Sequence, residues 1–401
     1  HAAYGHNNFF KKNHLFRQFT DAEEILPMMQ RLKRDVERYE ERYGVLEVTR
    51  LIDAAHALGD YGVNRYAKPA RRSPEEEQAR RAKIEEMRLQ NYDAVLDRVG
   101  SHIQSEFNKS KYNVPADLEE NLLRFIASDA PHLQPWQRNL LTQFADKEQY
   151  FYPQKQTQLM NEGWASFWHY TLMTDLREMD LISDGMYMEF LHSHSSVLMQ
   201  LDFDDPRSNG SINPYALGFA MFRDLRRMCE NPTDEDRQYF PNIAGQEWLP
   251  TLKKAMENHK DESFVLQYLS PKVMRDFRLF SFRNNTAEKF VNVTSIHDDD
   301  GYKQLREDLA SQYRLADREL QIEIAKYDYK GDRSLTLQHT VRNGVPVHKQ
   351  FATDTMKHLH YLWGHPVILH SVDNGIITDT LSVPANLSRQ PPKPGEKMTY
   401  K

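Results

Sequence analysis

The sequence has one cysteine, no long apolar run and no excess of positive charge. Cys229 alone excludes an intrachain disulfide framework and a multi-cysteine zinc site, and it is typical of a reducing, cytoplasmic compartment. No apolar stretch approaches the roughly 18 residues that a membrane-spanning helix needs. The formal net charge of −6 argues against a nucleic-acid binder, whose surface should be strongly basic.

The sequence also lacks the short motifs of several large enzyme classes. It contains no G-x-x-x-x-G-K-[ST], no G-x-G-x-x-G and no G-x-S-x-G pattern, so nucleotide binding and serine-hydrolase chemistry are unsupported. It has neither an initiating methionine nor a signal-peptide pattern, and we expect further residues to precede His1 in the natural protein. The 20 Tyr and 20 Phe provide core material for a globular chain of two or three domains.

Two kinds of hydrophobic periodicity divide the chain. Residues 1–282 follow a helical period, interrupted by a charged connector at about 71–113, and predict a mainly α N-terminal body. Residues 283–385 alternate between strand and helix patterns in the order β-α-β-β-α-β. That order predicts a C-terminal α+β domain of the ferredoxin-like type. Residues 386–401 are rich in proline and predict a loose tail.

An acidic and an imidazole side chain stand out within one predicted helix. Glu162 and His169 are seven residues apart, which is two helical turns, so they share a face. The residues between them are large and apolar, including Trp164 and Trp168, and predict burial. One interpretation is a buried polar pair that joins two helices. The other is a catalytic acid–base pair or a metal site, because desolvation beside tryptophan raises a carboxylate pKa.

A second imidazole pair lies at the start of the sequence. His1 and His6 are five residues apart, which rotates them by about 140° on an ideal helix. Both could bind one metal only if the helix ends or bulges near Gly5. The residue after His1 is alanine, so the general base of an H-E-x-x-H motif is missing. We expect His6, Glu162 and either His1 or His169 to be metal ligands, with Glu162 as ligand or base but not both.

Further candidates lie on the following predicted helices. His192 and His194 are two residues apart, so they point to different faces, and we expect one of them to face the core. Tyr215 follows the helix start Asn213-Pro214 and could point its hydroxyl into a cleft, although a packing role is favoured. The histidines of the C-terminal domain are expected at the surface: His297, His339, His358 and His360.

Several long motifs, in order, resemble one family. The chain is identified as a member of the SpoVR (stage V sporulation protein R) family, in its Gram-negative version, from His1 to about Leu381. The motifs are Tyr4-Gly5-His6-Asn7-Asn8-Phe9-Phe10-Lys11-Lys12-Asn13, Tyr150-Phe151-Tyr152-Pro153-Gln154, Met160-Asn161-Glu162-Gly163-Trp164-Ala165, Asn213-Pro214-Tyr215-Ala216-Leu217-Gly218 and Leu269-Ser270-Pro271-Lys272-Val273-Met274-Arg275-Asp276.

The resemblance implies a process more than a reaction. It implies formation of the spore cortex, a peptidoglycan layer, in spore formers, and stationary-phase and stress responses elsewhere. It implies two protein partners, an AAA+ serine protein kinase and a von Willebrand A-like protein. The pairing of a Gly-His helix with Glu-Gly-Trp-Ala is also similar to gluzincin-type zinc metallopeptidases, from which Ala2 departs.

Three functions follow from these expectations. The first is a metal-dependent hydrolase of amide or peptide bonds, with a divalent metal, zinc favoured, as cofactor and with Trp164 and Trp168 lining the cleft. The second is a non-catalytic regulator or scaffold that works with the kinase and the von Willebrand A-like partner. The third is a peptidoglycan-binding protein.

Overall fold

The computed structural model describes most of the chain outside the charged connector and the C-terminal tail. The charged connector at 71–113, the tail at 386–401, His297 and most of the loop at 202–214 lie outside the described residues. The described residues are 1–65, 121–201, 205, 212–283, 292–295, 298–314, 322–328, 331–341, 347, 349–373 and 375–383.

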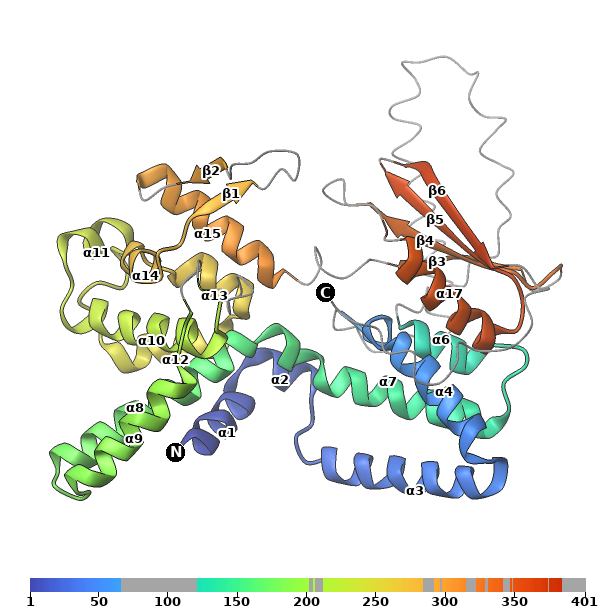
Figure 1. The fold of residues 1–401 in the computed structure, drawn as a ribbon, viewed down its shortest axis with the longest axis horizontal. Helices are drawn as coiled ribbons and strands as arrows, with labels where there is room; N and C mark the ends of the chain where they lie inside the picture. The colour runs from blue at the N-terminus through green and yellow to red at the C-terminus, as the bar shows by residue number, and fades with distance from the viewer. Residues whose placement is uncertain are drawn as a thin grey trace, which may run out of the picture. The chain divides into compact units, whose positions relative to one another are not determined.

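The chain forms two compact units, each built from two separate stretches of sequence (Figure 1). Unit 1 comprises residues 1–31 and 147–320, and unit 2 comprises residues 32–146 and 321–401. The chain therefore changes unit near residue 320, whereas the sequence placed a change of structure near residue 283. None of the described helices is both long and apolar enough to cross a bilayer.

Unit 1 is a helical body that carries a small two-stranded sheet. Helices α8 and α10 form its centre, and α1 packs against α8. The mainly helical character expected for the N-terminal body is confirmed. The elements are α1 (Ala2–Lys12), α2 (His14–Phe19), α8 (Gln158–Glu178), α9 (Asp184–Val197), α10 (Pro214–Glu230), α11 (Asp234–Tyr239), α12 (Trp248–Asn258), α13 (Asp261–Tyr268), α14 (Pro271–Asp276), β1 (Ser281–Arg283), β2 (Asn292–Ser295) and α15 (Asp299–Tyr313).

Local capping chemistry starts most of these helices. Asn213 accepts a hydrogen bond from the backbone N–H of Tyr215 and is followed by Pro214, which has a fixed φ that suits the first helical turn. Helix α8 is capped from elsewhere in the chain. The carboxylate of Asp261, at the start of α13, accepts the backbone N–H groups of Leu159 and Met160 at 2.9 Å each. This buried carboxylate therefore ties α13 to the positive end of α8.

Unit 2 combines helices with a four-stranded mixed sheet. The strands lie in the order β3-β4-β5-β6; β4 and β5 are parallel, and the two outer pairings are antiparallel. Helix α17 makes the crossover between the parallel strands, and its Trp363 stacks on Phe125. The elements are α4 (Val45–Ala57), the 3-10 turn Gly59–Tyr61, α6 (Leu122–Asp129), β3 (Ile322–Tyr327), β4 (Leu335–Thr340), α17 (Lys349–Trp363), β5 (Val367–Asp373) and β6 (Ile376–Val383). Two longer helices, α3 (Ile25–Tyr43) and α7 (Pro135–Gln156), each contain one of the three boundaries between the units.

The α+β character of the C-terminal part is confirmed, but the ferredoxin-like topology is not. The strand expected before α15 is β2, and it pairs with β1 instead of joining the four-stranded sheet. Helix α15 packs on α13, within unit 1. The four-stranded sheet therefore has the order β-β-α-β-β. The expectation of surface histidines was also wrong for His339 and His360, which are buried.

Candidate functional site

Helix α1 lies against α8 at a contact that only small residues allow. A Cβ placed on Gly5 would lie 2.8 Å from the Cα of Ala165, so the two backbones touch at this point. The helix is continuous through Gly5, whose N–H donates to the carbonyl of His1 at 3.0 Å. The histidines on either side of this contact, His1 and His6, therefore meet different parts of α8.

His6 faces Asn161 and Glu162. The His6 Nδ1 atom lies 3.0 Å from Asn161 Oδ1, and its Nε2 atom lies 3.6 Å from Glu162 Oε2. An amide oxygen can only accept, so the proton of this hydrogen bond is on Nδ1. In the neutral imidazole, Nε2 then carries a lone pair directed toward the carboxylate.

Tyr215 completes this group from α10. Its hydroxyl hydrogen-bonds to Glu162, and burial together with the nearby carboxylate raises the Tyr215 pKa. The side chains of His6 and Glu162 are 29% and 19% exposed, so water reaches them although the surroundings are largely protein. We call His6, Asn161, Glu162 and Tyr215 the His6–Glu162 site.

The distance between His6 and Glu162 indicates which interactions this site can form. At 3.6 Å, Nε2 and Oε2 are too far apart for a good hydrogen bond. Two ligands of one tetrahedral zinc ion, at bond lengths of about 2.0–2.2 Å, lie about 3.4 Å from each other. The site can therefore hold a cation between the imidazole and the carboxylate, or form an ion pair when His6 is protonated.

His1 lies with a second set of imidazoles, two turns further along α8. Its ring centroid is 5.8 Å from that of His169, which is 6.1 Å from that of His194. Phe190 on α9 closes one side, with its ring 4.8 Å from His169. We call His1, His169 and His194 the imidazole cluster. Glu162 and His169 share a helix face as predicted, about 10 Å apart along its axis.

Burial disfavours protonation of two members of the imidazole cluster, His169 and His194. Burial, followed by the charges of His169 and Arg223, lowers the pKa of His194 to about 4. Burial also lowers the pKa of His169. The Nε2 atom of His194 is buried and has no hydrogen-bond partner among the described residues. His192 is exposed, which confirms that one member of the His192–His194 pair faces the core.

The residues expected to form one metal site are therefore divided between two places. His6 and Glu162 come together, whereas His1 joins His169. Within the described residues, no group of three His, Cys, Asp or Glu side chains could hold a metal ion. The metal-binding and catalytic roles of these residues stay predictions. Trp164, expected to line a cleft, is 1% exposed and lies in the core, because it packs on Phe222 and donates its Nε1–H to Asn8.

Two residues of importance were missed in the sequence. Asn161 immediately precedes Glu162 and orients the imidazole of His6, which lies on a neighbouring helix. The amide beside Glu162 was the signal in the sequence that could have predicted this role. Asp261 is fully buried; burial raises its pKa to about 7, while the backbone N–H groups of α8 act to lower it. No local pattern could reveal Asp261, because its partners lie about a hundred residues earlier.

Comparisons with known proteins agree with one another. The family model described as SpoVR like protein matches residues 1–318, and the model described as SpoVR-like C-terminal domain matches residues 320–374. The two models meet where the chain passes from unit 1 to unit 2. A protein of Escherichia coli (strain K12), named "Uncharacterized protein YcgB", is 45% identical over 369 residues, which covers 92% of this chain and 72% of that protein. No solved structure matches. The chain therefore belongs to the SpoVR family.

Proposed function

We propose that this protein is a metal-dependent hydrolase of amide or peptide bonds, with a divalent metal, zinc favoured, bound at the His6–Glu162 site. The observation that supports the proposal is the 3.6 Å separation of His6 Nε2 and Glu162 Oε2. Asn161 strengthens it, because a hydrogen bond at Nδ1 leaves Nε2 free to bind a metal. The family's name suggests a role in sporulation. We therefore propose peptidoglycan of the bacterial envelope as the substrate and stress physiology as the wider process. We also propose that the protein acts in the cytoplasm.

Each residue of the site has a distinct part in this chemistry. His6 and Glu162 are the two ligands, and the Tyr215 hydroxyl fixes the orientation of the carboxylate through its hydrogen bond. His6 and Glu162 would hold the ion with positions left for water, and a bound divalent ion would supply a water of lowered pKa as the nucleophile for amide hydrolysis. His169 lies about 10 Å away along α8, so it is too far to bind the same ion and any acid–base role of His169 would be separate.

Elemental analysis of the protein, purified without a His-tag and reconstituted with zinc, tests this proposal. We expect about one metal ion per chain, bound weakly enough that His6→Ala and Glu162→Ala each abolish it. His192→Ala is the matched control, because His192 is exposed on α9 and should leave the metal content unchanged. A parent protein without metal, or equal metal in all four proteins, would contradict the metal site. Metal binding without release of free amino groups from peptidoglycan fragments would contradict the hydrolase.

A second candidate function is a non-catalytic regulator that docks a protein partner. The observation that favours it is the surface of α9 and of the turn before it, where apolar side chains are exposed. Flexible, polarizable methionines suit surfaces that pack against a partner. The partners to test are the AAA+ serine protein kinase and the von Willebrand A-like protein that the family resemblance implies. The exposed side chains are Met179, Leu181, Met186, Met188, Val197 and Met199.

Binding of the purified kinase, measured by titration calorimetry, separates the two functions. Under the regulator proposal, Met186→Glu together with Met188→Glu should abolish kinase binding, because charges would be placed in an apolar interface. His6→Ala should leave that binding unchanged. Equal kinase binding by both variants, or none by the parent protein, would contradict docking at this surface.

A further inference from the structure

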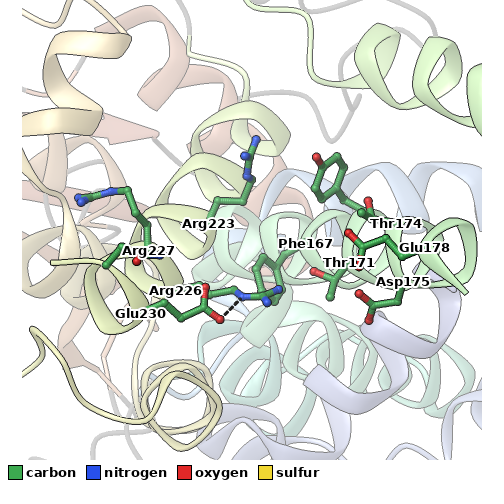
Figure 2. A pocket seen from close by; sticks show the side chains of 11 residues that line it. Phe167, Thr171, Thr174, Asp175, Glu178, Arg223, Arg226, Arg227 and Glu230 are labelled. Carbon is green, nitrogen blue, oxygen red and sulfur yellow. Dashed lines mark hydrogen bonds and ion pairs between the residues drawn. The ribbon is translucent and has the colours of Figure 1, made fainter.

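A cavity between α8 and α10 carries opposite charges on its two walls (Figure 2). Its volume is about 290 Å³, at the small end of ligand pockets. Helix α8 contributes Thr171, Asp175 and Glu178, which are spaced four and three residues apart and so share one face. Helix α10 contributes a matching row of arginines. One wall is therefore acidic and hydroxylated, and the other is basic.

The three arginines of the cavity differ in the side chains that they contact. Arg226 pairs with Glu230, and Arg227 pairs with both Asp224 and Asp236. Their charges are therefore already balanced by protein carboxylates. A ligand that arrived in the cavity would have to compete with these bonds.

Arg223 contacts aromatic rings instead of carboxylates. Its guanidinium carbon lies 5.1 Å from the centre of the Tyr170 ring and 5.4 Å from that of Phe219. Within the part of the chain that the structure describes, no carboxylate lies within ion-pair distance of it. The two rings hold the planar group in place and leave its N–H donors unused by an acid. Arg223 is thus an exposed cation beside two aromatic rings, and its guanidinium has the geometry that binds a carboxylate.

The acidic wall shows the complementary arrangement. Asp175 and Glu178 have no cationic partner among the described residues, and neither reaches Arg223 or Arg226 across the cavity. Carboxylates and an arginine that line the same small cavity without pairing leave space for a molecule that carries both charges.

We infer that this cavity binds a small zwitterion, namely a short peptide with free termini. Its carboxylate binds the guanidinium of Arg223, and its ammonium group lies between the carboxylates of Asp175 and Glu178, beside the hydroxyl of Thr171. A simple anion is disfavoured because two carboxylates would repel it, and a bare cation is disfavoured by the unpaired charge of Arg223. Preorganisation of Arg223 by the two rings reduces the entropy lost on binding.

This inference is independent of the proposed hydrolase. Glu162 and Asp175 are thirteen residues apart on α8, a rise of about 20 Å along the helix axis. The zwitterion cavity and the His6–Glu162 site therefore occupy different regions of the same helix pair. Loss of metal binding would leave peptide binding in place.

Titration calorimetry with L-alanyl-L-alanine as the probe tests the inference. We expect a Kd in the millimolar range or below. N-acetyl-L-alanyl-L-alanine lacks the ammonium group, and L-alanyl-L-alanine amide lacks the carboxylate. Each should bind at least tenfold more weakly than the free dipeptide. L-alanine and L-alanyl-L-alanyl-L-alanine are included to find the length that spans the cavity.

Variants assign the two charges to the two walls. Arg223→Gln should weaken dipeptide binding at least tenfold and should remove the preference for the free carboxylate over the amide. Asp175→Asn combined with Glu178→Gln should remove the preference for the free ammonium group over the acetylated form. Arg237→Gln and Glu189→Gln change the same charges at exposed positions on α11 and α9, and they should leave binding unchanged.

Three results would overturn the inference. They are no binding of any free peptide at millimolar concentration, equal binding of the free and blocked dipeptides, and equal dipeptide binding by the parent protein and Arg223→Gln. Thermal unfolding of each variant shows that the fold is intact, so a loss of binding cannot be attributed to misfolding.

Discussion

Gly163 on α8 and Gly218 on α10 touch through their backbones. A Cβ on Gly163 would lie 2.4 Å from the carbonyl carbon of Gly218, and one on Gly218 would lie 2.3 Å from the carbonyl oxygen of Leu159. Both atoms belong to the backbone, which cannot move aside without separating the two helices that carry Glu162 and Tyr215. The helix crossing therefore requires glycine at both positions.

We predict that Gly163→Ala destabilises the protein by about 1–3 kcal/mol or more, because overpacking at a tight contact forces backbone shifts. The measurement is the free energy of unfolding in urea. Gly185→Ala, on α9, is the matched control, because its Cβ would meet only the Ser183 hydroxyl at 4.0 Å. That control should be neutral or stabilising by about 0.5–1 kcal/mol. An equal effect of the two substitutions would show that α8 and α10 do not cross at these glycines.

Asp261→Asn is expected to destabilise the protein by about 1–3 kcal/mol, because one of the two buried N–H groups of α8 would lose its acceptor. An asparagine side chain offers one oxygen where the carboxylate offers two. Hydrogen exchange at Leu159 and Met160 should accelerate at only one of the two amides. Asp276→Asn, an exposed residue paired with Lys272, should change stability by less than about 0.5 kcal/mol. Unchanged exchange at both amides would contradict capping of α8 by Asp261.

The buried His194 should make the fold sensitive to mild acid. Its pKa is lowered to about 4 in the folded protein, below the ordinary value of 6.5, so the unfolded chain binds more protons between these pH values. The stability that depends on neutral His194 is fully present above pH 6.5 and is lost as the pH falls toward 4. The difference is at most about 3 kcal/mol.

Replacing His194 with phenylalanine should remove this acid sensitivity. The comparison is the free energy of unfolding of each protein between pH 7 and pH 4, and the wild-type curve should fall more steeply than that of His194→Phe. His192→Gln changes an exposed imidazole and should reproduce the wild-type slope. Parallel curves for the wild type and His194→Phe would mean that His194 is not desolvated in the fold.

Arg227 and Asp236 form an ion pair with two hydrogen bonds, and its loss should strongly lower the stability of the protein. The guanidinium donates to both oxygens of Asp236, at 2.7 and 2.8 Å, and the Asp236 side chain is 4% exposed. Burial acts to raise the Asp236 pKa, but hydrogen bonds from Arg227 and Thr233 lower it to about 2. Arg227→Met should cost about 3–5 kcal/mol, because it leaves a buried carboxylate unpaired.

The neighbouring Arg226 provides the control for this pair. Arg226 and Glu230 are about one-third exposed, so Arg226→Met should cost less than about 1 kcal/mol. Thermal unfolding at neutral pH compares the two variants. The order of stability predicted is wild type, then Arg226→Met, then Arg227→Met, and a reversal of the two variants would contradict the assignment of the buried pair.

Local chemistry explains which elements the sequence could predict. Asn213-Pro214 marks the start of α10 because capping and a fixed φ act within two residues. The strands β3, β4, β5 and β6 lie within residues 283–385, where the sequence predicted strands, since alternation is also a local property.

Pairings over long distances explain what the sequence could not predict. Strand β2 pairs with the three-residue strand β1, which is too short to show an alternating pattern. The spacing of His1 and His6 suggested one metal site, but α8 runs antiparallel to α1 and so presents a different partner to each histidine. Asn161 and Tyr215 gained their roles only through contacts with His6 and Glu162 from other helices.

The contact between α1 and α8 also sets an order of events during synthesis. His6 and Asn161 are 155 residues apart in the chain. At translation rates of about 5–20 residues per second, α1 waits about 8–30 s on the ribosome before α8 exists. During that interval Phe9, which is fully buried in the finished fold, has no native partner on α8. The His6–Glu162 site is therefore assembled only after synthesis of α8, and Phe9 acquires its buried surroundings no earlier than that.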